Sequence, residues 1–385
     1  MKIIRRIIEN YKPGQPFSRH LKDFFKTHPQ MGSRDRKLAA GFTYNYFRIG
    51  KALDDLRMIE RLTIANFLCS SASNPLLIYC IEKFSLLREK DIENSMEEKI
   101  EKIKQVYTHF NPEKIFPFSK YLGDDINRKK FISSFLSQPR LWIRIRRGFE
   151  RGVKQELTAK NILFEEDQNN PSSVSLLNAT SVEKTDSYLK GHFEIQDWSS
   201  QQTLNFIQPQ PNEMWWDACS GSGGKSLMMF DAEPSLKILA SDKRLSILKN
   251  LVDRFEKIDT MNLKIMELDL LSPPADLPAF NGIVADVPCS GSGTWARTPE
   301  WLTMFDENSI SQFVSIQRNI IKNLTHYLKP GTPLVYITCS VFKEENEKNI
   351  EWIEENMELT LQKSAYLEGY SLGADTMFAA RLIKR

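Results

Sequence analysis

Three apolar segments in the second half of the sequence each end in a loop that carries a cysteine. With their loops they read W-W-D-A-C-S-G at 215–221, I-V-A-D-V-P-C at 283–289 and L-V-Y-I-T-C-S at 334–340. Short apolar runs of this kind are typical of buried strands. Because open α/β sheets bind ligands at the carboxyl ends of their strands, we expect the three loops to converge on one site.

Strand-like and helix-like segments alternate from residue 212 to residue 385, which predicts a mostly parallel sheet with helical crossovers. We expect strands at residues 214–217, 236–241, 263–267, 282–286, 333–338 and 376–384. We expect helices at residues 225–230, 244–258, 307–328 and 344–357. The predicted fold class of this part is therefore α/β.

The first third of the chain is predicted to be helical. Apolar residues recur at intervals of three and four within residues 34–56, and further apolar stretches follow at 59–69 and 76–87. Residues 90–106 suggest a charged, exposed helix. Beyond these, an alternating strand at 140–147, a helix at 149–159 and short strands at 162–165 and 174–177 indicate a small α+β module.

Composition excludes several classes of protein. The chain is 41% hydrophobic and 26% charged, with no apolar run near the roughly 18 residues that span a bilayer. Its five cysteines are odd in number and widely spread, and none forms a CxxC pair or a zinc-binding cluster. We therefore expect a monomeric cytoplasmic protein with free thiols, no bound metal and no membrane contact.

Positive charge is concentrated in the first half of the chain. Residues 1–51 hold twelve Lys and Arg against three acidic residues, and a second basic cluster, which includes Arg144 and Arg146, lies within residues 140–154. This distribution suits a polyanionic partner such as RNA. Solvated charged faces explain it as well, and an alternating strand at a domain face would explain the two arginines.

The first strand-to-helix turn, D-A-C-S-G-S-G-G-K-S at 217–226, is rich in glycine but lacks a phosphate-binding fingerprint, since Cys219 stands where a P-loop needs glycine. Asp242 ends the next strand, where a carboxylate holds ribose hydroxyls in nucleoside-binding folds. Asp269 follows the third strand and is either an adenine contact or an exposed loop residue. These features favour an adenosine-containing ligand without a pyrophosphate, for which S-adenosylmethionine is the obvious candidate.

Three segments of the sequence resemble, in order and spacing, three motifs of the RNA cytosine-C5 methyltransferases. They are the glycine-rich turn, D-V-P-C-S-G-S-G-T-W-A-R-T-P-E and Y-I-T-C-S-V-F-K-E-E-N-E. The closest subgroup is the Sun/Fmu type, which acts on small-subunit ribosomal RNA. The resemblance implies a helical NusB-like domain at 1–125, a small α+β RNA-binding module at 126–190 and a Rossmann-like catalytic domain at 191–385. It also implies that the cofactor is S-adenosylmethionine and that the partner is RNA, with 16S ribosomal RNA as the preferred candidate.

The resemblance assigns roles to residues of these loops. It makes Cys339 the nucleophile that adds to cytosine C6, Cys289 the residue that aids product release, Asp286 the contact to the cytosine N3/N4 edge, and Lys225 a neighbouring contact. A thiolate suits this chemistry because it is both a strong nucleophile and a good leaving group. The cofactor-binding residues are expected to be Cys219, Ser220, Gly221, Ser222, Gly223, Gly224, Lys225, Asp242, Asp269 and Asp286.

Other interpretations remain open. Either cysteine could be buried filler and Lys225 a solvated lysine. The same chemistry could act on transfer RNA, or the chain could be a silent RNA-binding or ribosome-assembly factor. Arg297 and Glu300 match a family pattern that shapes a loop touching RNA or cofactor. The family's usual Ala-Ala-Pro is replaced at 220–222, and a usual arginine is Ile247, for which Arg244 could substitute.

Overall fold

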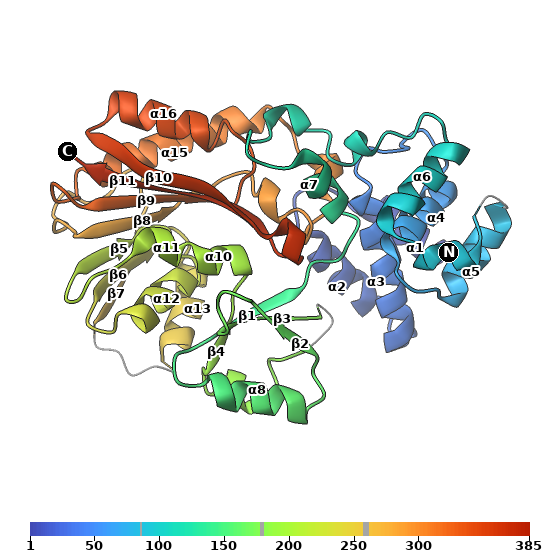
Figure 1. Cartoon of the computed structure of the whole chain (residues 1–385), viewed down its shortest axis with the longest axis horizontal. Helices are drawn as coiled ribbons and strands as arrows, with labels where there is room; N and C mark the ends of the chain where they lie inside the picture. Colours follow the sequence, from blue (N-terminus) through green and yellow to red (C-terminus); the bar gives the residue numbers. More distant parts are fainter. Residues whose placement is uncertain (85–86, 178–180, 257–261) are drawn as a thin grey trace. The chain divides into compact units, whose positions relative to one another are not determined.

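The computed structural model describes residues 1–84, 87–177, 181–256 and 262–385 (Figure 1). The chain divides into two compact units. The helical unit comprises residues 1–120, 127–138 and 294–307, and the sheet unit comprises residues 121–126, 139–293 and 308–385. Our division into domains at 1–125, 126–190 and 191–385 stays a prediction.

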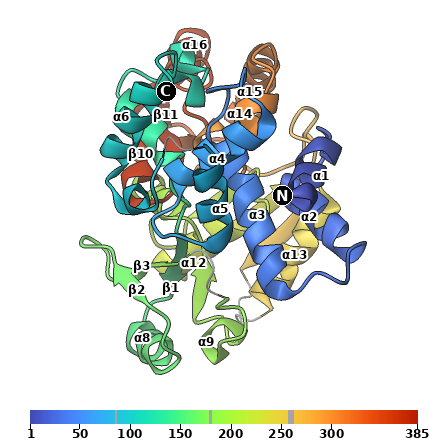
Figure 2. The same ribbon diagram turned by 90° about the vertical axis from the view of Figure 1, so that its right-hand side faces the viewer.

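The helical unit is built mainly of α-helices. They are α1 (Lys2–Asn10), α2 (Phe17–Lys26), α3 (Ser33–Arg48), α4 (Met58–Cys69), α5 (Pro75–Phe84), α6 (Met96–Val106), α7 (Arg128–Ser134) and α14 (Trp301–Met304). Short 3-10 turns lie at Glu89–Glu93, Pro112–Ile115 and Ser119–Tyr121. Helices α3, α4 and α5 lie side by side in both ribbon views (Figures 1 and 2). The predicted helices at 59–69 and 76–87 are confirmed as α4 and α5, although residues 85–86 lie outside the described residues.

Two predicted helices of this unit differ from the structure. The helix expected over 34–56 ends at Arg48, because Gly50 adopts φ +53° and a Cβ there would lie 2.0 Å from the Ile115 carbonyl oxygen. The helix expected over 90–106 begins only at Met96. The Ser95 hydroxyl caps it by accepting a hydrogen bond from the Glu98 backbone nitrogen, so the preceding residues form a separate 3-10 turn.

A four-stranded antiparallel sheet forms the first part of the sheet unit, in the order β2-β3-β1-β4. The strands are β1 (Leu141–Ile145), β2 (Phe164–Glu166), β3 (Ser173–Leu176) and β4 (Phe193–Ile195), with α8 (Glu150–Ala159) and the short α9 (Asp186–Leu189). Val153 and Leu157 of α8 pack with Ile143 and Val174 of the sheet in one apolar cluster. The predicted strands and helix of this module are confirmed.

A seven-stranded sheet forms the rest of the sheet unit, in the order β10-β11-β9-β8-β5-β6-β7. Strands β5 (Met214–Asp217), β6 (Lys237–Asp242), β7 (Leu263–Glu267), β8 (Gly282–Asp286) and β9 (Pro333–Thr338) are parallel. Strands β11 (Thr376–Lys384) and β10 (Leu359–Glu368) are antiparallel. The α/β fold class is therefore confirmed, and β10 is a strand that the sequence pattern missed.

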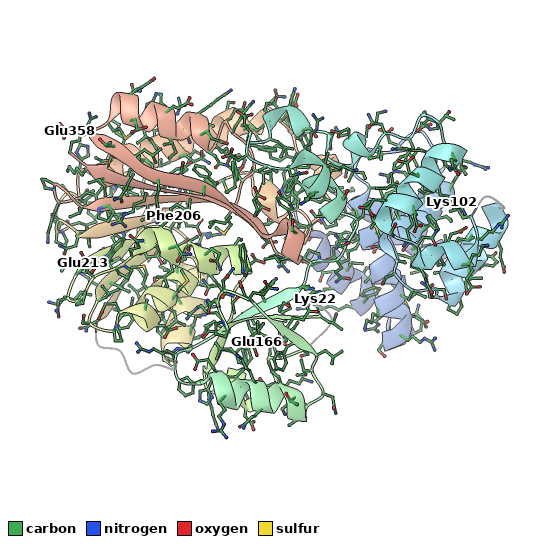
Figure 3. All side chains as sticks on the ribbon, viewed as in Figure 1. Lys22, Lys102, Glu166, Phe206, Glu213 and Glu358 are labelled. Atoms are coloured by element: carbon green, nitrogen blue, oxygen red, sulfur yellow. The ribbon has the colours of Figure 1, made fainter. Side chains whose placement is uncertain are left out.

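Helices cover both faces of the large sheet. On one face lie α10 (Trp198–Gln202), α11 (Leu204–Ile207), α12 (Gly224–Ala232) and α13 (Leu245–Phe255), and on the other lie α15 (Ser309–Thr325) and α16 (Glu347–Asn356) (Figure 1). Phe206 of α11 packs with Trp215 and Val335 in the core under the sheet (Figure 3). The helix expected over 244–258 corresponds to α13, and the last two of its expected residues lie outside the described part of the chain.

The order of the strands in the large sheet indicates where a ligand-binding crevice forms. Strand β5 pairs with β6 on one side and with β8 on the other, so the direction in which the sheet is built reverses between β5 and β8. Loops that leave the carboxyl ends of such neighbouring strands turn apart and open a crevice between them.

Among the described residues, no helix combines the length and the apolar character that a membrane-spanning helix needs.

Candidate active site

A cavity of about 790 Å³ opens at the carboxyl ends of β5, β6, β8 and β9. Nearly every residue predicted for the site lines it. They are Cys219, Ser220, Gly221, Ser222, Gly224, Lys225, Asp242, Asp269, Asp286, Cys289 and Cys339. Gly223 does not line it; with φ +81° it turns the backbone into α12, and a Cβ there would lie 2.7 Å from Leu251. The three cysteine loops therefore meet at one cavity, as the strand-end pattern predicts.

Two thiols from separate loops are in contact. The Cys289 and Cys339 sulfur atoms lie 3.3 Å apart, and one S–H group donates to the other sulfur. The loops are held together beyond the β-ladder, since the Gly293 backbone nitrogen donates to the Cys339 carbonyl at 2.9 Å. Gly293 has to be glycine, because a Cβ there would lie 1.9 Å from the Thr376 carbonyl oxygen. Hydrogen bonding to Cys339 and burial raise the pKa of the Cys289 thiol well above its ordinary value.

Lys225 and Asp286 line the cavity next to the thiols, and Asp217 is buried beneath the lining. Lys225 Nζ lies 2.5 Å from Asp286 Oδ2. Burial alone would lower the pKa of Lys225, but the charges of Asp286 and Asp217 raise it above its ordinary value, so this ammonium keeps its proton. Asp217 accepts a 2.6 Å hydrogen bond from the Ser226 hydroxyl, and burial raises its pKa to about 6.

The glycine-rich turn is fastened to the end of β6. The Ser220 backbone nitrogen donates to the Ser241 carbonyl at 2.8 Å, and the Gly221 nitrogen donates to Asp242 Oδ2 at 3.1 Å. Arg244 also pairs with Asp242, with Nε 3.0 Å from Oδ1. These bonds order the turn without the proline that the family usually has. That Arg244 substitutes for the arginine missing at Ile247 stays a prediction.

Three features of the cavity lining suit an adenosine-containing ligand. Gly221 faces open space, with nothing within 4 Å of a Cβ built on it, so the turn leaves room for a ligand against the backbone. Leu268, Leu270 and Ile320 supply apolar lining, which suits a planar base. Asp242 is at the strand end that suits ribose hydroxyls, whereas Asp269 is bound by Lys243 at 2.7 Å and accepts from the Leu271 nitrogen.

Glu345 lies behind the cavity lining and is one residue that sequence reasoning missed, as are Asp197 and Arg254, which line the cavity. The Glu345 side chain is fully buried, and the hydroxyls of Ser290 and Ser340, each of which follows a cysteine, donate to it. Burial raises the pKa of Glu345, and these hydrogen bonds oppose the shift. The repeated Cys-Ser pairs of the sequence were the available signal, because a serine next to each cysteine is a donor that needs an acceptor.

Other residues that were predicted to contact RNA or cofactor form bonds within the protein. Arg144 Nη1 and Arg146 Nε lie 2.5 and 2.8 Å from the oxygens of Asp231 on α12, which supports the reading of these arginines as parts of a packed sheet face. A role of Glu300 in a loop that touches RNA or cofactor stays a prediction. Glu300 is buried in the helical unit, where it accepts a hydrogen bond from the Phe17 backbone nitrogen at 3.0 Å.

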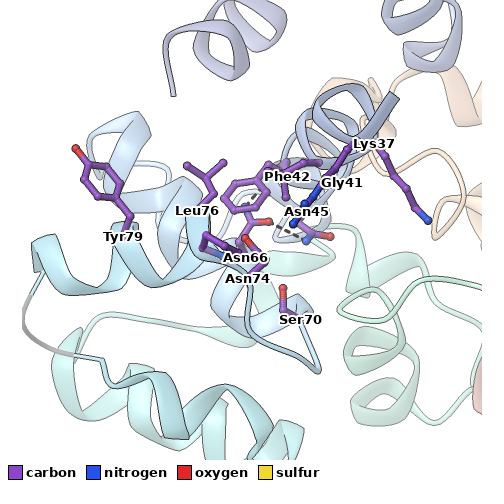
Figure 4. Close-up of a pocket in the computed structure, with 12 residues that line it drawn as sticks. Lys37, Gly41, Phe42, Asn45, Asn66, Ser70, Asn74, Leu76 and Tyr79 are labelled. Atoms are coloured by element: carbon purple, nitrogen blue, oxygen red, sulfur yellow. Dashed lines mark hydrogen bonds between the residues drawn. The ribbon is translucent and has the colours of Figure 1, made fainter. Parts of the chain in front are cut away.

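A second cavity, of about 730 Å³, lies in the helical unit between α3, α4 and α5 (Figure 4). Lys37 and Tyr79 stand at its sides, and Phe42 and Leu76 line it. The polar groups of its wall bond to each other, since Asn45 Nδ2 donates to Asn66 Oδ1 at 2.9 Å. Among the described residues no group of three or more His, Cys, Asp or Glu side chains is placed to hold a metal ion.

Comparison with known proteins identifies the domain that carries the first cavity. Residues 204–382 match the family model described as 16S rRNA methyltransferase RsmB/F. Over these residues the chain is similar to the RsmB/F family. The resemblance to Sun/Fmu-type methyltransferases is thereby confirmed for most of the sheet unit.

Two curated relatives of the RsmB/F domain carry the name ribosomal RNA small subunit methyltransferase B. The Shewanella oneidensis protein is 32% identical over 167 residues, which cover 42% of this chain and 38% of that protein. The Pasteurella multocida protein is 26% identical over 277 residues, which cover 67% and 62%. The chain thus spans less than two thirds of the length of these relatives.

Two solved structures share the fold of this chain over long stretches. The crystal structure of PH0851 covers 99% of this chain, with 97% of its own chain covered, at a TM-score of 0.73 and 20% identity. A methyltransferase homolog protein from Pyrococcus horikoshii covers 74% of this chain, with 98% of its own covered, at a TM-score of 0.61 and 20% identity. At this level of identity they show the fold, which agrees with the predicted Rossmann-like class.

Proposed function

We propose that this protein transfers a methyl group from S-adenosylmethionine to C5 of a cytosine in small-subunit ribosomal RNA, through a covalent bond between Cys339 and cytosine C6. The observation that carries the proposal is the pair of thiols 3.3 Å apart at the cavity formed by the carboxyl ends of the strands. The RsmB/F match of residues 204–382 and the names of the relatives support ribosomal RNA as the substrate. Action on ribosomal RNA in the cytoplasm is part of this proposal.

The chain's own residues suggest how the cofactor would be held. Asp242 would accept from the ribose hydroxyls, with Arg244 moving aside, which its 64% exposed side chain permits. The glycine-rich turn at 219–224 and the lining at Leu268 and Ile320 would hold the remainder. S-adenosylmethionine would supply an electrophilic methyl group, and the carboxylates of Asp217 and Asp286 give that end of the cavity the negative charge that a sulfonium requires.

The geometry favours Cys339 as the nucleophile. Either thiol can donate in the S–H···S hydrogen bond, and this bond together with burial raises the pKa of Cys289, which disfavours a thiolate at Cys289. The Lys225 ammonium, whose pKa is raised chiefly by Asp286 and in part by Cys339, would stabilise the thiolate that attacks from Cys339.

The remaining groups suit the steps that the reaction needs. The Asp286 carboxylate, steadied by Lys225, would hold the N3/N4 edge of a cytosine taken out of its stack. Addition of the Cys339 thiolate to C6 moves an electron pair toward C5, which then accepts the methyl group. Loss of the C5 proton to a base breaks the bond between sulfur and C6 and restores the thiolate, and Cys289 is in contact with the leaving sulfur.

Substitution of the two cysteines tests this mechanism. We expect Cys339→Ser to abolish methyl transfer to small-subunit RNA in vitro while leaving S-adenosylmethionine binding intact. We expect Cys289→Ala to accumulate a covalent protein–RNA adduct that survives denaturation, because product release is impaired. Cys69→Ala, which removes a thiol of the helical unit, is the matched control and should behave as the unaltered protein. Full activity of Cys339→Ser would refute the nucleophile assignment.

The substrate is tested in cells. Bisulfite sequencing of total RNA with and without the gene should reveal one or a few cytosines of 16S ribosomal RNA that are protected only when the gene is present. Protection confined to transfer RNA would establish the same chemistry on the other substrate. If the same cytosines are protected with and without the gene and the protein still binds RNA, the protein is a silent assembly factor and the proposal is wrong.

A further inference from the structure

The Glu345 carboxylate lies behind the two cysteine loops and is hydrogen-bonded to both. Its Oε1 atom accepts from the Ser290 backbone nitrogen and from Gln317 Nε2, each at 2.9 Å. Its Oε2 atom accepts from the Ser290 hydroxyl at 2.6 Å and from the Ser340 hydroxyl at 2.5 Å. Since each serine directly follows one of the two cysteines, one side chain joins the loops a single residue away from each thiol.

All the bonding capacity of this carboxylate is used inside the protein. Two carboxylate oxygens offer about four acceptor positions, and the four donors fill them. Glu345 is 0% exposed, so neither a cofactor nor a base can reach it directly. Burying a carboxylate opposes folding unless its bonds compensate, so a role for Glu345 has to be sought in what those bonds hold.

The two loops need such a connection because the backbone ladder ends before them. The pairing of β8 with β9 stops at Asp286 and Ile337, two or three residues short of the cysteines. Beyond that point, side chains carry much of the contact between the loops. The Ser292 and Ser340 hydroxyls lie 3.1 Å apart and continue the network that is centred on Glu345.

We propose that Glu345 is a positioning residue that keeps the Cys289 and Cys339 sulfur atoms in contact by binding the two serines that follow them. This inference rests on the proposed function, in which the two thiols act on the same cytosine. A displacement of about 1 Å between reacting groups is enough to slow an enzymatic reaction about a hundredfold. Glu345 would thus act on the chemistry through Ser290 and Ser340, without touching the substrate.

The Gln variant separates the geometry of this connection from its charge. In Glu345→Gln the amide oxygen can accept from the Ser290 nitrogen and Gln317, while the amide nitrogen donates to the two serine hydroxyls, which rotate to accept. This variant keeps the connection and removes the charge, whereas Glu345→Ala removes both. Glu344→Gln is the matched control, because the neighbouring Glu344 carboxylate pairs with Lys348 of α16 at 3.2 Å instead of accepting from the two serines.

Thiol proximity can be read without any RNA. Phenylarsine oxide bonds two neighbouring thiols through one arsenic atom and releases one water, and the adduct is counted by mass spectrometry of the whole protein. We expect the unaltered protein, Glu345→Gln and Glu344→Gln to capture one arsenical that either Cys289→Ser or Cys339→Ser abolishes. We expect Glu345→Ala to bind it at least about tenfold more weakly, and RNA methylation to lose about tenfold or more in kcat with KM for the cofactor unchanged.

Each outcome decides the proposal. A folded Glu345→Ala protein that captures the arsenical as well as the unaltered protein would overturn it, as would a Gln variant as impaired as the Ala variant. If Glu345→Ala does not fold, the Ser290→Ala/Ser340→Ala pair of substitutions, which removes the two hydroxyl donors and keeps the carboxylate, should show the same loss. Since arsenical capture needs no methyl transfer, a protein inactive on RNA would refute the proposed function while leaving this test valid.

Discussion

Asp217 ends β5 with no exposed surface, and its Oδ1 atom has no hydrogen-bond partner among the described residues. Burial raises its pKa from 3.8 to about 6, so the folded protein binds a proton here more tightly than the unfolded chain does. The stability that this proton contributes is therefore complete below about pH 4 and is lost as the pH rises through 6.

This pH dependence can be measured with an uncharged replacement. We expect the unfolding free energy of the unaltered protein, relative to Asp217→Asn, to fall by roughly 1 kcal/mol between pH 5 and pH 7. Urea unfolding at the two pH values gives the difference directly. Asp253→Asn, a substitution of an exposed aspartate on α13, serves as control, and equal pH profiles for all three proteins would contradict the buried assignment.

At the scale of single residues, sequence reasoning located the cavity but not its support. Cys289, Cys339 and Asp286 could be brought together from the rule that parallel strand ends share one edge. Glu345 could not, because it lies in a run of acidic residues that reads as a solvated helix. The helix α16 begins only at Glu347, and Glu345 turns inward before it.

At the scale of elements, one acid joins the small sheet to the large one. Asp231 at the end of α12 pairs with Arg144 and Arg146, and the side chains of Asp231 and Arg144 are each only 9% exposed. Removing one partner of a buried pair leaves the other charge without compensation. We expect Asp231→Ala to lower the unfolding free energy by about 3 kcal/mol.

The small sheet itself offers a control for the Asp231 substitution. Arg140 and Glu165 also pair, but their side chains are 43% and 69% exposed. Glu165→Ala should change the unfolding free energy by less than about 1 kcal/mol, because exposed pairs contribute little. Chemical denaturation of both variants measures the contrast, and similar losses would show that burial of the Asp231 pair does not govern its strength.

Elements with a strong period were predicted and those at edges were not. Strands β5, β8 and β9 are buried apolar runs, and their bounds agree with the structure. Strand β10 lies at the edge of the sheet, where half of its residues face solvent and mask the apolar signal. The early end of α3 depends on the close approach of Gly50 to Ile115, a contact between residues far apart in sequence that no local pattern contains.

At the scale of the whole molecule, binding to RNA should depend on the positive charge of the helical unit. Lys2, Lys12 and Lys22 are exposed there (Lys22 is labelled in Figure 3). Each phosphate that a lysine neutralises releases counterions, so the RNA affinity falls with salt at a slope of about −0.7 per contact on single strands. We expect the triple replacement of these lysines by glutamine to weaken binding to small-subunit RNA and to reduce the salt slope by about 2.

The control for the triple lysine replacement removes the same number of positive charges from a different part of the protein. Lys237, Lys264 and Lys329 are exposed at or near the amino ends of β6, β7 and β9, opposite the ends that carry the cavity. Their replacement by glutamine removes the same three charges, and we expect it to leave the salt slope near that of the unaltered protein. Titrations of fluorescent RNA at several salt concentrations measure both variants. Equal slopes for the two triple variants would show that net charge alone attracts the RNA, and that the basic surface of the helical unit makes no specific phosphate contacts.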